Sequence, residues 1–490
     1  MWNTFRLLLF PVLNALGTVL IAFAALMLVP AAFSWYEGDG VLGDFLRGAA
    51  VTGGAGLALW LAFRPFRREM TARHGFLLVT LSWSVTAAFA TIPMLMHFEH
   101  YGFSEMLFEM MSCLTTTGGT VMTGLDHLPP SVNGWRCLLS WVGGMGLIVL
   151  SVAILPLLGV GGAQIMKAET SGPMKETRLT PRIAETARAL YLLYLGLSVA
   201  CAISYHFAGM NWRDAVMHMM TTVSLSGIGA HDESFGFFAS GAVDLVAIVF
   251  MVASGCNFSL HFLAWRRRSV RAYLRDPEFL SWTGLLGVLT FAVTLALLVT
   301  RVYNDPIDAL RDAAFAVVST ASTTGFATVD WSLWPLGLPL VILLSSAVAS
   351  CAGSTGGGLK MFRVLILAKQ AKREFTNLLY PNAVAPLTVG GTPISNSIAF
   401  AVLAYTLLWF ATAFGGTLVL LATGLAPLEA CSAAFSSLAN LGPGLGFVGP
   451  AGNFASIEDF QLDILTFLML TGRLEIFTVF VLFTRAFWET

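Results

Sequence analysis

Four short strings contain the residue types of a carbonyl-lined cation site. They are TTTGGT (115–120), SLSGIG (224–229), STTGFA (322–327) and ANLGPGLG (439–446). Glycine allows the backbone to turn its carbonyl oxygens inward, and a ring of such oxygens replaces the hydration shell of an ion in a selectivity filter. The strings therefore predict a filter for a cation. A second interpretation stays open here, because Gly and Thr in membrane proteins also serve close helix packing.

Each string keeps a fixed distance from an acidic residue and from a hydroxyl group. With one glycine per string as the anchor, the anchors are Gly118, Gly227, Gly325 and Gly442. The residues 13 positions before them are Glu105, Asp214, Asp312 and Glu429, and those six positions before are Ser112, Thr221, Ser319 and Ser436. We expect each acid to cap the start of a short helix and to oppose the positive end of its dipole. Helix packing does not require this common spacing, so the strings indicate four copies of one unit.

The composition indicates that the chain is dissolved in lipid. Of its 490 residues, 56% are hydrophobic and 11% are charged, whereas soluble proteins carry about 25% charged residues. The six cysteines stand singly, so neither a disulfide framework nor a thiolate metal site is indicated. No catalytic set of residues is recognisable, and the sequence predicts a polytopic membrane protein that is not an enzyme.

Ten apolar segments are long enough to cross a bilayer, which takes about 20 residues. They are 7–33, 41–63, 75–97, 135–160, 188–209, 240–264, 279–302, 333–367, 396–425 and 457–487. Four shorter runs, 104–116, 213–225, 307–323 and 428–440, each end in one of the strings and are typical of re-entrant helices.

The expected fold is therefore an all-α polytopic membrane protein with four helix, re-entrant helix, helix repeats, preceded by two extra transmembrane helices. The predicted parts are 1–74 for the two extra helices and 75–187, 188–276, 277–393 and 394–490 for repeats one to four. With both termini in the cytosol, 21 of the 27 Lys and Arg residues fall on the inner side, as the positive-inside rule requires. The acidic residues gather outside, where they would concentrate cations or merely aid solubility.

A glycine-rich string interrupts the eighth predicted span. The sequence AGSTGGGLK (352–360) disfavours a continuous helix. It does not match a phosphate-binding loop, because Leu359 separates Gly358 from Lys360 and no strand precedes it. A kink that serves helix packing remains the alternative to a functional loop.

Arg473 is the one basic residue deep within a predicted span. A charge inside the membrane is costly and by default indicates function. Its guanidinium would repel cations and could hold a nearby loop through hydrogen bonds to carbonyl oxygens. A structural Arg bonded to neighbouring helices is the alternative. Glu475, two positions on, lies on another helix face and cannot form an i,i+4 pair with it.

Taken together, these stretches resemble the Trk/Ktr/HKT superfamily of potassium transporters, most closely its bacterial TrkH type. The resemblance covers nearly the whole chain, including the two extra helices at its start. Its most specific pieces are TTTGGTVMTGLD (115–126), AQIMKAETSGPMKETRLTPRIAETARALY (163–191), AHDES (230–234), STTGF (322–326), GSTGGGLK (353–360), NLGPGLG (440–446) and LTGRLEIFT (470–478).

The resemblance implies a pseudo-fourfold pore within one chain, whose filter carbonyls bind potassium at and just before each anchor glycine. The implied filter residues are Thr116, Thr117, Gly118, Leu225, Ser226, Gly227, Thr323, Thr324, Gly325, Asn440, Leu441 and Gly442. It also implies a gate below the filter, formed by Gly353, Ser354, Thr355, Gly356, Gly357, Gly358 and Arg473.

The function implied by the resemblance is potassium uptake across the bacterial inner membrane. The implied partners are a second copy of the chain and a cytosolic TrkA-type RCK-domain subunit that binds NAD or ATP/ADP, so that this chain needs no organic cofactor. The inner loops 163–188, 266–275 and 361–393 are basic enough to dock such a partner or to face anionic lipid. No nucleic acid is expected. The alternative is a secondary transporter that couples potassium entry to protons or sodium.

Overall fold

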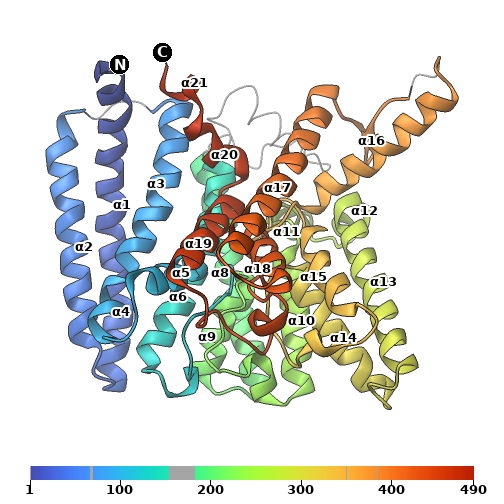
Figure 1. Ribbon diagram of the computed structural model, residues 1–490, viewed down its shortest axis with the longest axis horizontal. Helices are drawn as coiled ribbons and strands as arrows, with labels where there is room; N and C mark the ends of the chain where they lie inside the picture. The colour runs from blue at the N-terminus through green and yellow to red at the C-terminus, as the bar shows by residue number, and fades with distance from the viewer. Residues whose placement is uncertain (1, 67–69, 154–182, 349, 383–384, 490) are drawn as a thin grey trace.

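The computed structural model describes residues 2–66, 70–153, 183–348, 350–382 and 385–489. This part of the chain is helical, apart from a two-stranded ribbon formed by β1 (Thr388–Val389) and β2 (Thr392–Pro393). The long helices run between two opposite faces of the molecule (Figure 1). Both termini lie on the same face (Figure 1).

Two helices precede the repeated part and stand at one edge of the molecule (Figure 1). They are α1 (Trp2–Glu37) and α2 (Leu42–Phe63), which pack against each other. Gly17 and Gly56 make this contact close, because a Cβ on either would lie closer than 3.0 Å to backbone of the other helix. Small residues allow helices in lipid to approach in this way. The predicted extra helices are thus confirmed.

The remaining helices repeat one order four times: an outer helix, a short re-entrant helix and an inner helix. The outer helices are α3 (Ala72–Ala90, continued by α4, Ile92–His97), α8 (Ile183–Phe207), α13 (Pro277–Val299) and α17 (Asn396–Ala422). The re-entrant helices are α5 (Phe103–Leu114), α9 (Trp212–Val223), α14 (Pro306–Ala321) and α18 (Pro427–Ala439). The inner helices are α6 (Pro130–Ala153), α10 (Gly241–Gly255), α15 (Leu338–Val348) and α19 (Asp459–Arg473).

The packing of these helices closes a ring. Each inner helix contacts the re-entrant helix of the following repeat, in the pairs α6 with α9, α10 with α14, α15 with α18, and α19 with α5. The last pair joins the fourth repeat to the first. The predicted fold class, with four repeats around one axis, is confirmed.

Three predicted spans are broken, and the others that the structure describes are helical. α10 bends by 94° into α11 (Phe258–Arg267), and α19 bends by 113° into α20 (Ile476–Phe480). The span predicted for 333–367 is split into α15 and α16 (Met361–Leu379). Among the described residues six helices are long and apolar enough to cross a membrane, or up to eight if each bent pair is one span. Each of the ten predicted segments holds a helix, but three of them are bent or interrupted, because apolar content does not register a bend.

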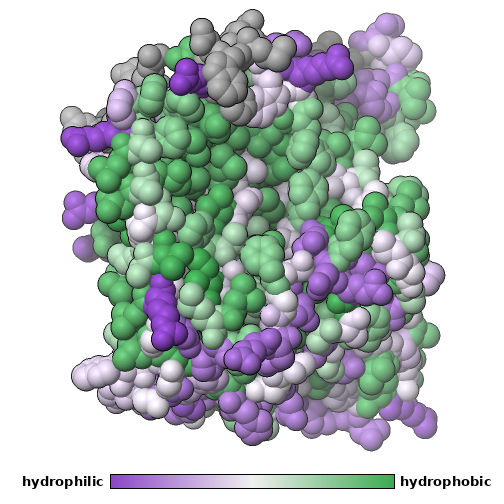
Figure 2. Space-filling view, turned by 60° about the vertical axis from the view of Figure 1, so that its left-hand side comes forward, coloured by the Kyte–Doolittle hydropathy of each residue, from purple (hydrophilic) through white to green (hydrophobic). Residues whose placement is uncertain are grey.

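Short elements complete the chain. They are the helices α12 (Arg271–Arg275) and α21 (Arg485–Trp488) and the 3₁₀ turns Arg64–Phe66, Leu125–His127, Ser234–Phe238, Trp331–Leu333, Gly446–Val448 and Val481–Phe483. Figure 2 shows a broad hydrophobic band across the middle of one face, with hydrophilic residues gathered above and below it. Large exposed apolar side chains such as Phe291 and Phe400 belong to the outer helices α13 and α17. Such a band is what a bilayer requires of the surface that it touches.

Candidate functional site

Each re-entrant helix ends with the same backbone turn. The residues two positions before the anchors have φ between 53° and 58°: Thr116, Leu225, Thr323 and Asn440. The N–H just before each anchor donates to the carbonyl oxygen five residues back at 2.8–3.0 Å, from Thr117 to Ser112, Ser226 to Thr221, Thr324 to Ser319 and Leu441 to Ser436. This is the hydrogen-bond pattern of a Schellman C-cap. The residue six positions before each glycine is thus the acceptor of this bond.

The left-handed residue in this turn is strained in three of the four repeats. Asn tolerates positive φ, but β-branched Thr116 and Thr323 and bulky Leu225 adopt it rarely. Such a conformation costs about 1–3 kcal/mol and persists where the surrounding structure over-determines it, most often at functional sites.

The four anchor glycines interlock around one axis. Each has positive φ and faces the carbonyl oxygen just before the anchor of the next repeat. A Cβ would lie closer than 3.0 Å to that oxygen in every case: from Gly118 to Ser226, Gly227 to Thr324, Gly325 to Leu441 and Gly442 to Thr117. One carbonyl from each repeat therefore lies in a closed ring of four, and only glycine leaves room for it.

Side-chain hydrogen bonds set the first and third repeats apart from the other two. In the first repeat the hydroxyls of Thr115 and Thr117 are 2.8 Å apart, and Ser112 donates to the carbonyl of Gly119 at 2.6 Å. The third repeat repeats both contacts, between Ser322 and Thr324 at 2.6 Å and from Ser319 to Phe326 at 2.7 Å. The second repeat bonds Thr221 within its own helix, and the fourth carries Ala439 and Leu441 at the hydroxyl positions. The backbone turn is common to all four repeats, whereas this hydroxyl support is shared only by the first and third.

Of the four predicted capping acids, three lie in the first turn of their helix. Glu105 accepts the N–H of Gly102 at 2.7 Å. Asp214 instead accepts the side-chain amide of Asn211 at 2.8 Å, and Asn211 itself caps α9. Glu429 lies at the third position of α18. The acids thus face the start of the helix dipole, but they are not the N-cap residues.

The assignment of Asp312 as a cap is wrong. α14 has 16 residues and begins at Pro306, whereas the other re-entrant helices have 12 or 13. A fixed distance from Gly325 therefore falls inside the helix, and Asp305 caps it by accepting the N–H of Ile307 at 2.9 Å. Asp312 accepts hydrogen bonds from Tyr303 at 2.8 Å and Arg311 at 3.0 Å.

The glycine-rich string between α15 and α16 lies against three of the four turns. Thr355 donates its hydroxyl to the carbonyl of Val223 at 3.1 Å, at the end of α9. The N–H of Gly357 donates to the hydroxyl of Thr323 at 2.7 Å. A Cβ on Gly357 would collide with the carbonyl of Ala439. The string is buried from Ser354 to Lys360 and touches the ends of three re-entrant helices.

Arg473 holds this string from the side. It lies at the end of α19, 2% exposed, and donates from Nη1 to the carbonyl of Thr355 at 2.8 Å and from Nη2 to that of Gly143 at 3.3 Å. Beyond the bend, Glu475 accepts a hydrogen bond from Arg363 of α16 at 2.6 Å. The two charges therefore reach different elements, as their spacing predicts.

Comparison with known proteins shows which family the chain belongs to. The TrkH family model, described as a cation transport protein, matches residues 43–489. The chain belongs to the TrkH family. It is 42% identical over 483 residues to the Trk system potassium uptake protein TrkH of Halomonas elongata, covering 98% of this chain and 99% of that one. It is 41% identical over 474 residues to the protein of the same name from Escherichia coli K12, covering 96% and 98%.

A solved structure matches the TrkH fold over nearly the whole chain. The crystal structure of the potassium transporter TrkH from Vibrio parahaemolyticus aligns with a TM-score of 0.91 at 39% identity. The alignment covers 98% of this chain and 100% of that one. The ring of repeats is therefore the TrkH architecture.

Two acidic residues of this TrkH-family chain escaped the sequence analysis. Glu278 at the start of α13 accepts the N–H groups of Ala352 at 2.6 Å and Phe362 at 3.0 Å, one at each end of the buried string. It stands one residue before the predicted span 279–302, where an acidic residue carries no distinguishing signal. Glu109 pairs with Arg136 behind the first turn. The signal that could have found it is a charge within the apolar run 104–116.

Proposed function

We propose that this chain takes up potassium across the bacterial inner membrane through a filter formed by the loops that follow α5, α9, α14 and α18, here called the filter loops. The observation that carries the proposal is the closed ring of four carbonyls, each held against the glycine of the neighbouring loop. Carbonyl oxygens replace the hydration shell of a potassium ion in such a ring. The names of the Halomonas and Escherichia relatives support potassium as the ion.

The filter residues that we propose are those at the anchor and the two positions before it in each loop. The left-handed turn at the second position before the glycine and the positive φ at the glycine are common to all four loops. Backbone at membrane depth avoids helix only where it lines a watery path or is buried in protein. The packing-only interpretation does not explain why each glycine faces a carbonyl of the next loop.

Residues 352–358, here called the gate segment, would block the path below the filter. The segment packs against the ends of α9, α14 and α18, so ions that leave the filter meet protein and not water. Arg473 adds a positive charge at this level and bonds the segment through Thr355. We propose that conduction requires the segment to move away from the pore axis.

The proposed orientation has both termini and the basic helix α16 in the cytosol. They lie on the same side of the molecule (Figure 1), and α16 carries Arg363, Lys369, Lys372 and Arg373, as the positive-inside rule expects. A homodimer that binds a cytosolic TrkA-type RCK subunit, itself regulated by NAD or ATP/ADP, remains our proposal for the assembly. The Trk system names of the relatives support a partner of this kind. Most of the stretch 163–188, one proposed docking site, lies outside the described residues.

The test is uptake of ⁸⁶Rb⁺ into potassium-loaded proteoliposomes that contain this chain alone, with and without a proton or sodium gradient. Passive flux down the rubidium gradient, competed by potassium, is the expected result. Flux that appears only with a proton or sodium gradient would overturn the pore and favour a secondary transporter. Adding the partner subunit with NAD, ATP or ADP should then change the rate, and a rate that no nucleotide alters would contradict the proposed regulation.

A further inference from the structure

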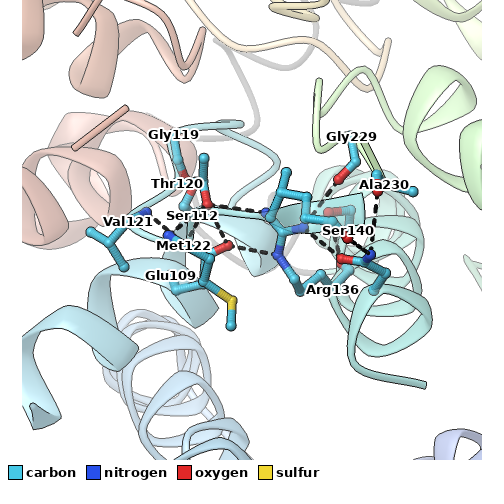
Figure 3. Close-up of polar contacts among 12 residues, drawn as sticks. Glu109, Ser112, Gly119, Thr120, Val121, Met122, Arg136, Ser140, Gly229 and Ala230 are labelled. Atoms are coloured by element: carbon cyan, nitrogen blue, oxygen red, sulfur yellow. Dashed lines mark hydrogen bonds and ion pairs between the residues drawn. The ribbon is translucent and has the colours of Figure 1, made fainter. Parts of the chain in front are cut away.

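A fully buried ion pair lies behind the first filter loop. Glu109 of α5 and Arg136 of α6 have side chains that are 0% and 1% exposed, and Nε of Arg136 lies 2.8 Å from Oε1 of Glu109. Figure 3 shows the guanidinium between this carboxylate and the carbonyl of Gly229, which belongs to the second filter loop. The pair is therefore not confined to one repeat.

The remaining N–H groups of Arg136 connect the two loops. Nη1 donates to the side chain of Asn133 and to the carbonyl of Gly229, each at 3.0 Å. Nη2 donates to the hydroxyl of Thr120 at 3.1 Å. Because the guanidinium is planar and rigid, these distances are coupled. Moving either loop away from the pore axis would break at least one of these bonds.

Glu109 holds the first loop from the other side. Its Oε2 accepts the hydroxyl of Thr120 and the N–H of Val121, each at 2.9 Å. Thr120 stands two residues after Gly118, as Gly229 stands two residues after Gly227. The ion pair thus bonds both loops at equivalent positions, two residues after the glycine of the carbonyl ring.

The other three repeats have no acidic residue at the position of Glu109. The position of Glu109, nine residues before the anchor, is His218 in the second repeat and Ala316 and Ala433 in the third and fourth. An alanine cannot form an ion pair, so the charged support is specific to the junction of the first two loops. A buried pair of charges is costly to form, and removing one partner leaves the other charge uncompensated.

We infer that Arg136 is a positioning residue that sets the spacing of the first two filter loops and thereby the discrimination of potassium against sodium. The inference rests on the proposed function. A smaller ion is bound well only if the carbonyls move closer to it, and a rigid strut between two loops opposes that movement.

The decisive variant is Arg136→Lys. Lysine keeps the buried charge beside Glu109 but has no planar fork that reaches Thr120, Asn133 and Gly229 together. Arg311→Lys is the matched control, because Arg311 also pairs with acids near a re-entrant helix, through Asp308 and Asp312. The measurement is inhibition of ⁸⁶Rb⁺ uptake by external potassium and by sodium in proteoliposomes. The ratio of the two half-inhibitory concentrations does not depend on how many molecules are open or folded.

We expect Arg136→Lys to lower the sodium-to-potassium ratio of half-inhibitory concentrations about fivefold, as the partial loss of a charge-assisted hydrogen bond implies. Arg311→Lys should keep the wild-type ratio. A wild-type ratio in Arg136→Lys overturns the inference and leaves the proposed function intact, whereas a wild-type protein without flux overturns the proposed function. If Arg136→Lys does not fold, Thr120→Val is the deciding variant, because it removes only the hydroxyl that bonds both Arg136 and Glu109. A lowered ratio in Thr120→Val supports the inference, and an unchanged ratio overturns it.

Discussion

The filter loops and the gate segment are both glycine-containing backbone buried beside the pore axis, but they are held in different ways. Each filter loop is fixed by N–H bonds to its own helix and by a glycine against the next loop, and this arrangement occurs four times. The gate segment occurs once and is held by single contacts from several elements, among them Arg473, Glu278 and the backbone N–H of Phe258, which donates to the carbonyl of Gly353. A closed ring of backbone contacts cannot open at one point, whereas a segment held by separate single contacts can be released.

The largest effect should come from Gly325→Ala, which disrupts the ring of filter carbonyls. The new Cβ would collide with the carbonyl of Leu441 at a backbone position with φ of 89°, where a side chain adds strain of about 1–3 kcal/mol. We expect ⁸⁶Rb⁺ uptake to fall below about a tenth of wild type. Gly284→Ala on α13, where a Cβ meets nothing within 4 Å, is the control. Normal uptake by purified, monodisperse Gly325→Ala would show that the ring is not the filter.

Arg473→Ala should act in the opposite direction, by releasing the gate segment. It removes two hydrogen bonds from a charged donor, to Thr355 and Gly143. Each such bond contributes about 1.5–3 kcal/mol, and relief of the buried charge offsets part of this. We expect passive uptake to rise about tenfold.

The control for Arg473→Ala is Arg485→Ala, at an exposed position of α21. Its uptake should match wild type. Unchanged or abolished uptake in correctly folded Arg473→Ala would argue against a barrier at this residue.

Glu278→Ala should give a smaller increase, because Glu278 holds Ala352, at the start of the gate segment, and Phe362, beyond its end, and not its middle. The substitution leaves the N–H groups of Ala352 and Phe362 without their carboxylate acceptor. We expect passive uptake to rise about threefold. Glu278→Gln keeps an acceptor oxygen and should stay closer to wild type. Equal uptake in both variants would mean that these two bonds do not restrain the segment.

The smallest effect concerns a charged contact at the junction of the first two loops. His231, in the loop between α9 and α10, lies 2.5 Å from Asp126 and 3.5 Å from Asp214 and stacks near His218. Burial would lower the pKa of His231, but the two carboxylates raise it above its ordinary value of 6.5. The contact therefore stabilises the fold fully below pH 6.5 and loses this effect as the pH rises through the raised pKa.

The measurement is thermal unfolding of wild type and His231→Gln across this pH range. We expect the wild type to be more stable by about 1–2 °C at low pH, with the difference vanishing at high pH. A difference that stays constant with pH would show that the imidazolium does not contribute.

The repeat was predictable from the sequence because the features that define it depend on residues close together along the chain. The anchor glycines, the residues six positions before them and the break at 352–358 all reflect hydrogen bonds or backbone angles within a few residues of each other. The length of the apolar runs likewise followed from the bilayer. The boundaries proposed for the repeats, such as 187/188, stay predictions.

Only the tertiary structure shows which residues far apart in the sequence are in contact. The bends after Gly255 and Arg473 are not visible in the apolar content of the sequence. The extra length of α14 moved Asp312 away from the helix start. Arg136, the second residue of the predicted span 135–160, is buried against Glu109, and the sequence does not show this pair, because contacts between side chains far apart along the chain leave no periodic mark. The sequence determined four loops with the same backbone turn, whereas the tertiary structure decided that only the junction of the first two contains the Glu109–Arg136 ion pair.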